Sequence, residues 1–200
     1  HLSLRRQRQM CIRDRAYAVV DDPSLPNTRP DKADRLIVVD DALQTLQTLA
    51  REHRRELGLP ILAITGSNGK TTTKELVSRV LAEKYEVYAT RGNLNNHIGV
   101  PLTLLAMTRD VEFGIVEMGA SACGEIALLC SIAEPNYGIV TNIGRAHLEG
   151  FGGPEGVRRG KGELYDWLAR TGGRVFVPAN DPVLMSMAVS YTHLTLPTKA

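Results

Sequence analysis

Short apolar runs alternate with longer amphipathic stretches from residue 61 onward. The apolar runs predict buried strands at residues 61–65, 86–89, 113–118, 138–141 and 174–177. The stretches between and after them predict helices at about 71–84, 100–107, 124–132 and 154–168. Because strands joined by crossover helices pair in parallel, the pattern predicts an α/β fold, a parallel sheet with helices on both faces. Ligands of such sheets bind at the carboxyl ends of the strands.

The chain before residue 61 has a different pattern. Residues 35–40 predict one more buried strand, after which Asp40 or Asp41 can cap an amphipathic helix. Gly58 and Pro60 are expected to end that helix. Residues 22–34 contain three prolines and predict a surface connection.

Composition and charge exclude several classes of protein. With 43% hydrophobic and 23% charged residues, the 200-residue chain can bury a core and is not disordered. No apolar run approaches the roughly 18 residues of a membrane-spanning helix. The net charge of +2 owes much to residues 1–15, which hold five arginines against one aspartate. The rest of the chain is mildly acidic, so no nucleic-acid partner is expected.

The coding sequences of the two chain ends can be complementary to each other. The peptides MCIRDR (10–15) and VSYTHL (189–194) can be written in codons that are reverse complements over most of their length. We interpret residues 1–15 and 189–200 as translated sequencing-adapter DNA that flanks a fragment, and exclude them from fold reasoning. The alternative is a basic N-terminal arm that binds an acidic partner.

Cysteine usage indicates a reducing compartment. Without Cys11, the chain keeps Cys123 and Cys130, seven residues apart in a predicted helical stretch. The spacing is not that of a CxxC motif, and no histidine cluster lies nearby in the sequence. We therefore predict two buried thiols of a cytoplasmic protein, and neither a zinc site nor a disulfide framework.

The segment TGSNGKTT (65–72) lies directly between a predicted strand and a predicted helix. Glycines let backbone N–H groups converge on phosphate oxygens, and the helix N-terminus adds partial positive charge. Lys70, expected to face solvent until a phosphate binds, would contact the β- and γ-phosphates, and the Thr71 hydroxyl would bind Mg²⁺. Ile64 stands where the strict Walker pattern has glycine, so the loop is a variant. The residues predicted to bind the ATP phosphates are Gly66, Ser67, Asn68, Gly69, Lys70, Thr71 and Thr72.

This segment also has a plainer interpretation. A strand–turn–helix junction uses glycine for the turn, and its lysine then points into solvent. The position of GKTT at the junction favours the phosphate loop.

Two further side chains follow predicted strands. Glu117 ends the run FGIVEM, so its carboxylate would lie at the same sheet edge as the loop and could bind a phosphate-bound Mg²⁺. The alternative is an acid that caps the next helix. His147 follows the strand at 138–141, and a single loop histidine more often has a structural role.

Lys161 has an unusual position for a lysine. It falls in line with Val157, Leu164 and Leu168, the apolar positions of the predicted helix 154–168. Such a lysine either extends its amine to the surface or holds a desolvated, reactive amine toward a site.

Several motifs together resemble the Mur ligase family, and within it the members that add D-alanyl-D-alanine. These motifs are TGSNGKTTTKEL (65–76), GNLNNHIGVPLT (92–103), EMGA (117–120), GEI (124–126) and TNIGRAHLEGFG (141–152). The family has an N-terminal domain for the uridine nucleotide, a central ATPase domain and a C-terminal domain that closes over ATP and the amine. The resemblance implies that residues 16–58 are the end of the first domain and 59–188 most of the second. The third domain is expected to be absent.

The resemblance also implies roles for individual residues. Lys70 and Thr71 match the phosphate and magnesium residues, and Glu117 and His147 match metal ligands. Lys161 matches the lysine that the family carries as a carbamate, an anion that helps to hold a second Mg²⁺. The residues implied as catalytic are thus Lys70, His147 and Lys161, and those implied to bind substrate are Asn95 and Asn96. The sequence departs from the family at His97, where an acid is common, and at Gly160, where alanine is common.

The implied activity is an ATP-dependent carbon–nitrogen ligation of peptidoglycan precursor synthesis, on which cell-wall formation, cell shape and division depend. ATP would phosphorylate the terminal carboxylate of UDP-N-acetylmuramoyl-tripeptide, and the amine of D-alanyl-D-alanine would attack the acyl phosphate. Residues 16–188 alone are expected to bind Mg²⁺-nucleotide weakly and to form no product. The alternatives are another Mur-type or folylpolyglutamate-type ligase, or a P-loop ATPase or binding module that does not ligate.

Overall fold

The computed structural model describes residues 16–28, 30–144 and 148–189, which form two compact units that divide between Leu46 and Gln47. The division falls inside helix α3 (Ala42–Leu57). The sequence placed a domain boundary after residue 58 instead, and that boundary stays a prediction.

The first unit contains a small parallel sheet. Strand β1 (Ala18–Val20) pairs with β2 (Leu36–Val38), and between them lie α2 (Leu25–Thr28) and the 3-10 helix η1 (Pro30–Arg35). The Asp41 carboxylate accepts the Gln44 N–H at 2.8 Å, so Asp41 caps α3 as predicted.

The predicted surface connection is largely exposed where the structure describes it, and it contains two short helical segments because proline fits the first turn of a helix. Another prediction for the first unit needs correction. The strand predicted as buried is largely exposed, with Ile37 and Val38 more than 40% accessible. In the described part of this unit, the two-stranded sheet is too small to bury both of its faces.

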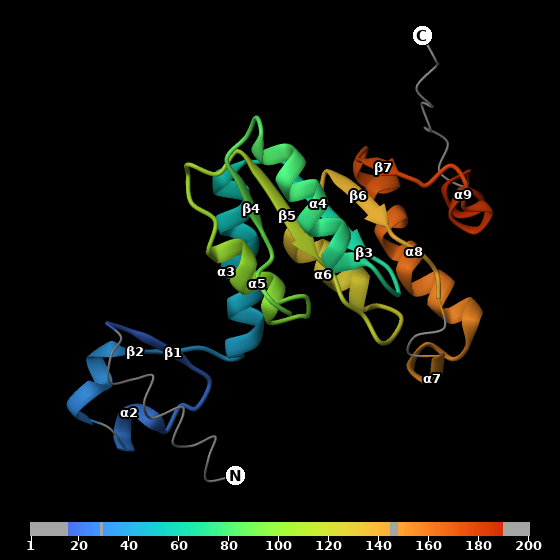
Figure 1. Cartoon of the computed structure of the whole chain (residues 1–200). Helices are drawn as coiled ribbons and strands as arrows, with labels where there is room; N and C mark the ends of the chain where they lie inside the picture. The colour runs from blue at the N-terminus through green and yellow to red at the C-terminus, as the bar shows by residue number, and fades with distance from the viewer. Residues whose placement is uncertain (1–15, 29, 145–147, 190–200) are drawn as a thin grey trace. The chain divides into compact units, whose positions relative to one another are not determined.

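The second unit is built on a five-stranded parallel sheet, which confirms the predicted α/β fold (Figure 1). The strand order is β4-β5-β3-β6-β7. The strands are β3 (Ile61–Thr65), β4 (Val87–Ala89), β5 (Phe113–Glu117), β6 (Tyr137–Val140) and β7 (Arg174–Phe176). Each lies within two residues of its predicted position. The carboxyl ends of the three central strands, β5, β3 and β6, therefore meet at one edge of the sheet.

Helices cover both faces of this sheet, as the alternating pattern predicted. Helix α4 (Lys70–Ala82) packs on the face that carries Leu62, Ile64 and Ile115. The opposite face packs against the remaining long helices. These are α5 (Gly99–Leu105), α6 (Glu125–Ala133), α8 (Pro154–Thr171) and the second half of α3. In the described part of the chain, no helix is long and apolar enough to span a membrane.

Among the described residues of the second unit, two helices were not predicted. Helix α7 (Leu148–Phe151) has a single turn, too short for its apolar periodicity to be recognised. Helix α9 (Pro182–Val189) begins after Asp181, whose carboxylate accepts the N–H groups of Val183 and Leu184. The Asp-Pro pair is a helix start signal that the sequence interpretation passed over.

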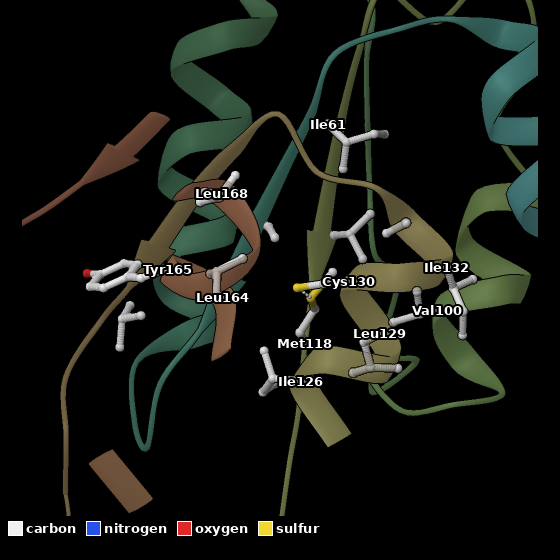
Figure 2. Packing of buried hydrophobic residues seen from close by; sticks show 14 of the residues in the cluster. Ile61, Val100, Met118, Ile126, Leu129, Cys130, Ile132, Leu164, Tyr165 and Leu168 are labelled. Carbon is white, nitrogen blue, oxygen red and sulfur yellow. Dashed lines mark hydrogen bonds between the residues drawn. The ribbon is translucent and has the colours of Figure 1, made fainter. Parts of the chain in front are cut away.

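The main core lies between the sheet and helices α6 and α8. Figure 2 shows side chains from several elements in this core, among them Leu164 and Leu168 of α8, Cys130 of α6 and Ile61 of β3. A Cβ at Gly138 of β6 would lie 2.5 Å from the Leu168 Cδ1, so glycine lets α8 approach the strand closely.

We expect Leu164→Ala to lower the free energy of unfolding by about 2–5 kcal/mol, because Leu164 is fully buried and its removal leaves a cavity. Chemical denaturation measures this loss. Leu76→Ala on α4 is the matched control, since Leu76 is 60% exposed and should change stability by less than about 0.5 kcal/mol. Equal effects of the two substitutions would contradict the packing described for α8.

The two cysteines differ, contrary to the prediction of two buried thiols. Cys130 is buried in α6, and its burial raises the pKa of the thiol. Cys123 is exposed and precedes α6, which begins only at Glu125, so the two thiols do not share a helix face. Helix α6 begins within one residue of its predicted start at 124, so Cys123 lies in the loop before it.

In a Cys11→Ser background, we expect a soluble thiol reagent to label Cys123 rapidly and Cys130 only on unfolding. The reason is that thiolate formation at Cys130 is opposed by burial. Adding Cys123→Ser should remove the fast phase, while Cys130→Ser should leave it intact. Fast labelling that survives Cys123→Ser would refute the assignment.

Candidate functional site

The loop between β3 and α4 has the backbone of a phosphate-binding loop. Gly66 has a φ of 138° and Gly69 a φ of 78°, values that side chains other than glycine rarely adopt. A Cβ at Gly66 would collide with the Thr141 hydroxyl, whereas the space beside Gly69 is open. The loop therefore leads into the N-terminus of α4, whose first amides lack partners within the helix and can bind an anion.

Lys70 is the first residue of α4 and folds back over this loop. Its Nζ donates to the carbonyl of Gly66 at 2.8 Å and lies 3.4 Å from that of Ser67. The expectation that Lys70 faces solvent before a phosphate binds is therefore wrong. The amine is half-buried, because the loop carbonyls are the acceptors within its reach.

Three residues singled out in the sequence meet at the carboxyl end of β5. The Glu117 carboxylate, 2% exposed, accepts the Thr71 hydroxyl at 3.1 Å and the Asn95 amide at 3.0 Å. In the described part of the chain, no lysine or arginine forms an ion pair with Glu117. A buried carboxylate with two neutral donors still favours a cation beside it.

These groups fit a magnesium ion. Mg²⁺ prefers hard oxygen ligands and usually takes one or two carboxylates together with phosphates and water. Thr71 and Glu117 supply a hydroxyl and a carboxylate at the edge where the phosphate loop ends. The described residues contain no cluster of three or more histidines, cysteines and acids, so a metal here would depend on further ligands of other kinds. His147, predicted as one of them, lies outside the described residues.

Lys161 lies buried on α8, which agrees with the second of the two alternatives that its apolar stripe left open. The side chain is 2% exposed, its Nζ donates to the Ala120 carbonyl at 3.0 Å, and the Phe151 ring centroid lies 5.1 Å away. Burial, together with the positive charge of Lys70, lowers the pKa of Lys161 to about 8. A substantial fraction of the amine is therefore neutral near pH 8, the form that reacts with carbon dioxide.

Asn95 and Asn96 have different local contacts. Asn95 binds Glu117, whereas the Asn96 Oδ1 accepts the N–H groups of Ile98 at 3.1 Å and Gly99 at 2.8 Å. Asn96 thus satisfies amides at the start of α5. The neighbouring His97, noted as a departure from the family, accepts the Gln47 amide with its backbone carbonyl.

One cavity joins these elements. It has a volume of about 490 Å³ and opens at the carboxyl edge of the sheet. Among its lining residues are Lys70, Asn95, Asn96, His97, Glu125 and Lys161. The phosphate loop, the asparagine segment and the buried lysine, which are far apart in the sequence, thus face a common space.

Comparison with known proteins assigns this domain. The family described as the Mur ligase middle domain matches residues 64–196, two thirds of the chain. The chain belongs to the Mur ligase family. The UDP-N-acetylmuramoyl-tripeptide–D-alanyl-D-alanine ligase of Bacillus subtilis (strain 168) is 44% identical over 169 residues, which are 84% of this chain and 36% of that protein.

Solved structures of Mur ligases have the same fold. The MurF ligase of Thermotoga maritima in complex with ADP superimposes with a TM-score of 0.78 at 33% identity, over 88% of this chain and 40% of that one. MurF from Acinetobacter baumannii gives a TM-score of 0.72 at 37% identity, over 78% and 35% of the two chains. The chain therefore spans about a third of the length of these Mur ligases.

In this Mur ligase domain, the sequence interpretation missed the residues that brace the phosphate loop. The backbone carbonyl of Asn142 accepts the Ser67 N–H at 3.1 Å, and the side-chain oxygen of Asn142 accepts the Asn68 N–H at 3.0 Å. The Thr141 hydroxyl donates to the Asn68 carbonyl at 2.6 Å. The available signal was the polar pair directly after a buried strand, since neighbouring strand ends meet at one edge.

Thr90 was missed for a similar reason. Its hydroxyl accepts the Glu117 N–H at 3.0 Å, and its carbonyl accepts the buried Lys74 amine at 2.6 Å. Thr90, which directly follows β4, thereby fixes the position of Glu117 at the end of β5. Nothing in the spacing of these residues along the chain indicated that they would meet.

Proposed function

We propose that this domain is the ATP-binding core of a ligase that joins D-alanyl-D-alanine to UDP-N-acetylmuramoyl-tripeptide in the cytoplasm. The observation that carries the proposal is one cavity that is lined by the phosphate loop, by Asn95 and by Lys161. The substrates are suggested by relatives whose names specify them. We further propose that residues 16–58 belong to a uridine-nucleotide-binding domain.

ATP would bind with its phosphates on the loop. Within the predicted phosphate-binding residues 66–72, the amides at the N-terminus of α4 and the Lys70 amine would contact the β- and γ-phosphate oxygens. Lys70 would then replace its hydrogen bonds to the loop carbonyls with contacts to phosphate. Thr71 and Glu117 would hold Mg²⁺, and a carbamate on Lys161 with His147 would hold a second ion. Bound there, Mg²⁺ neutralises the charge of the phosphates.

The chemistry would then proceed in two displacements. A carboxylate oxygen of the tripeptide attacks the γ-phosphorus, the bond to ADP breaks, and an acyl phosphate forms. The amine of D-alanyl-D-alanine attacks the acyl carbon, loses a proton and expels phosphate, which takes the former carboxylate oxygen with it. The protein contributes position and positive charge, with Lys70 on the transferred group and Asn95 and Asn96 toward the substrate.

Substrate dependence tests this function in a full-length protein that contains this chain. We expect phosphate release from ATP to require both the muramoyl tripeptide nucleotide and D-alanyl-D-alanine. Release stimulated by folate and glutamate would instead indicate a folylpolyglutamate-type ligase. Release that needs no acceptor would indicate a P-loop ATPase, and either result would overturn the proposal.

A further inference from the structure

The segment between β5 and α6, residues 118–124, forms the wall against which Lys161 lies. The Ala120 carbonyl in this segment accepts the Lys161 amine at 3.0 Å. Lys161 is 2% exposed, so the position of its amine depends on where this segment lies. What holds the segment therefore decides where the amine points.

Two carboxylates hold this segment through its backbone amides. Glu125 accepts the N–H groups of Ser121 at 2.5 Å and Ala122 at 3.1 Å with one oxygen. Glu163 accepts the Gly124 N–H at 2.6 Å with Oε1 and the Ala127 N–H at 2.9 Å with Oε2. Hydrogen bonds from amides to ionised carboxylates are stronger than those between neutral groups.

Glu163 differs from Glu125 because it comes from another helix. It lies on α8, two residues after Lys161, yet it satisfies amides at the N-terminus of α6 that would otherwise lack partners. The Cys123 thiol also contacts the Gly156 carbonyl of α8 at 3.4 Å. Helix α8 thus contacts the segment 118–124 both before Lys161, at Gly156, and after it, at Glu163.

The geometry also limits what Glu163 does. Each of its oxygens accepts a backbone amide, and among the residues that the structure describes it forms no ion pair with Lys161. Its negative charge acts on the Lys161 amine only without direct contact, whereas its hydrogen bonds fix the backbone beside that amine, and the role considered for it is therefore one of position.

We propose that Glu163 is a positioning residue for Lys161: by bridging α8 to the N-terminus of α6, it fixes the Ala120 carbonyl and holds the Lys161 amine toward the phosphate-loop cavity. The inference rests on the proposed function, in which Lys161 carries a carbamate that binds metal. Without the bridge, Lys161 stays on α8, but the direction of its amine is no longer fixed by the Ala120 carbonyl. The carbamate, and the metal ion that the carbamate would hold, are then less well placed.

The test compares Glu163→Gln with Glu155→Gln in the full-length protein supplied with ¹³C-bicarbonate. Glutamine keeps the size of Glu163 but turns one acceptor into an N–H donor that faces an amide. Glu155 is the matched control, because it lies on the same helix and is exposed. Carbamate is read from its ¹³C NMR signal, loop order from amide hydrogen exchange over residues 120–127, and folding from thermal unfolding.

We expect Glu163→Gln to lose most of the carbamate signal, to exchange amides 120–127 faster, and to lower kcat about 10- to 100-fold, in the range typical of residues that orient metal ligands. The KM for ATP should change little. Glu163→Asp, which keeps the charge but is too short to bridge the helices, should behave like Glu163→Gln and serves as the second variant if glutamine prevents folding.

Three outcomes are distinguishable. A carbamate signal in Glu163→Gln equal to that in Glu155→Gln would overturn the inference and leave the proposed function standing. A parent-like signal in Glu163→Asp would show that charge, not position, is what Glu163 supplies, and would also overturn it. No carbamate signal in the parent protein would overturn the proposed role of Lys161 itself, and the inference with it.

Discussion

Replacing Lys70 with alanine in the full-length protein is expected to reduce ATP turnover by about 10²- to 10³-fold, the range found when one donor to a developing charge is removed. The Lys70 amine lies 2.8 Å from a carbonyl of the phosphate loop and is therefore already at the place where phosphate oxygens would bind. A steady-state assay of phosphate release measures the loss.

The fold should survive this substitution. Lys70 is half-buried, and its contacts are to loop carbonyls, whose loss costs about 1 kcal/mol for each hydrogen bond. Lys84→Ala is the matched control, because Lys84 follows the same helix and lies over the Tyr85 ring, away from the loop. Turnover of Lys70→Ala close to that of Lys84→Ala would remove Lys70 from the site.

Replacing Lys161 with alanine is expected to abolish ligation, with partial recovery when acetate is added. The substitution empties a buried position beside the Ala120 carbonyl, and a small carboxylate could occupy it as the missing anion. The measurement is the rate of product formation across a series of acetate concentrations. A neutral molecule of similar size, acetamide, should not restore the rate.

The pH dependence offers a second readout of this residue. Burial lowers the pKa of Lys161 to about 8, so the neutral amine, and with it carbamate formation, should increase as the pH rises toward 8 and above. Arg170→Ala, in the last turn of the same helix, should leave activity and its pH dependence unchanged. Full activity of Lys161→Ala without any additive would refute its assignment.

Periodicity predicted the larger elements of the second unit well, since each has an uninterrupted apolar pattern. Strand β3 and the start of α8 lie where the pattern predicted them. The same reasoning was wrong about residues 36–38 of β2, which are apolar but largely exposed. The sequence of β2 has the apolar residues of a buried strand, but a two-stranded sheet has no further strands or helices packed on both faces to bury them.

The site could be predicted from the sequence as far as strand ends and helix faces allow. Glu117 was expected at the sheet edge because it ends a strand. Lys161 was placed on an apolar stripe with leucines, which left open whether its amine is buried or extends to the surface, and the structure buries it. The contact of Asn95 with Glu117 and the bridge from Glu163 were not predictable, because they join segments through irregular loops. Loop conformation depends on backbone hydrogen bonds that no local periodicity records.

The most direct test of the proposed chemistry follows one oxygen atom. The full-length protein is supplied with ATP, Mg²⁺, D-alanyl-D-alanine and UDP-N-acetylmuramoyl-tripeptide whose terminal carboxylate carries ¹⁸O, and the released phosphate is analysed by mass spectrometry. If an acyl phosphate forms on the Lys70 loop and the amine displaces it, each phosphate released with product carries one oxygen from the carboxylate. Phosphate that carries no ¹⁸O would mean that water, not the tripeptide carboxylate, accepts the phosphoryl group, and would contradict the proposed ligase mechanism.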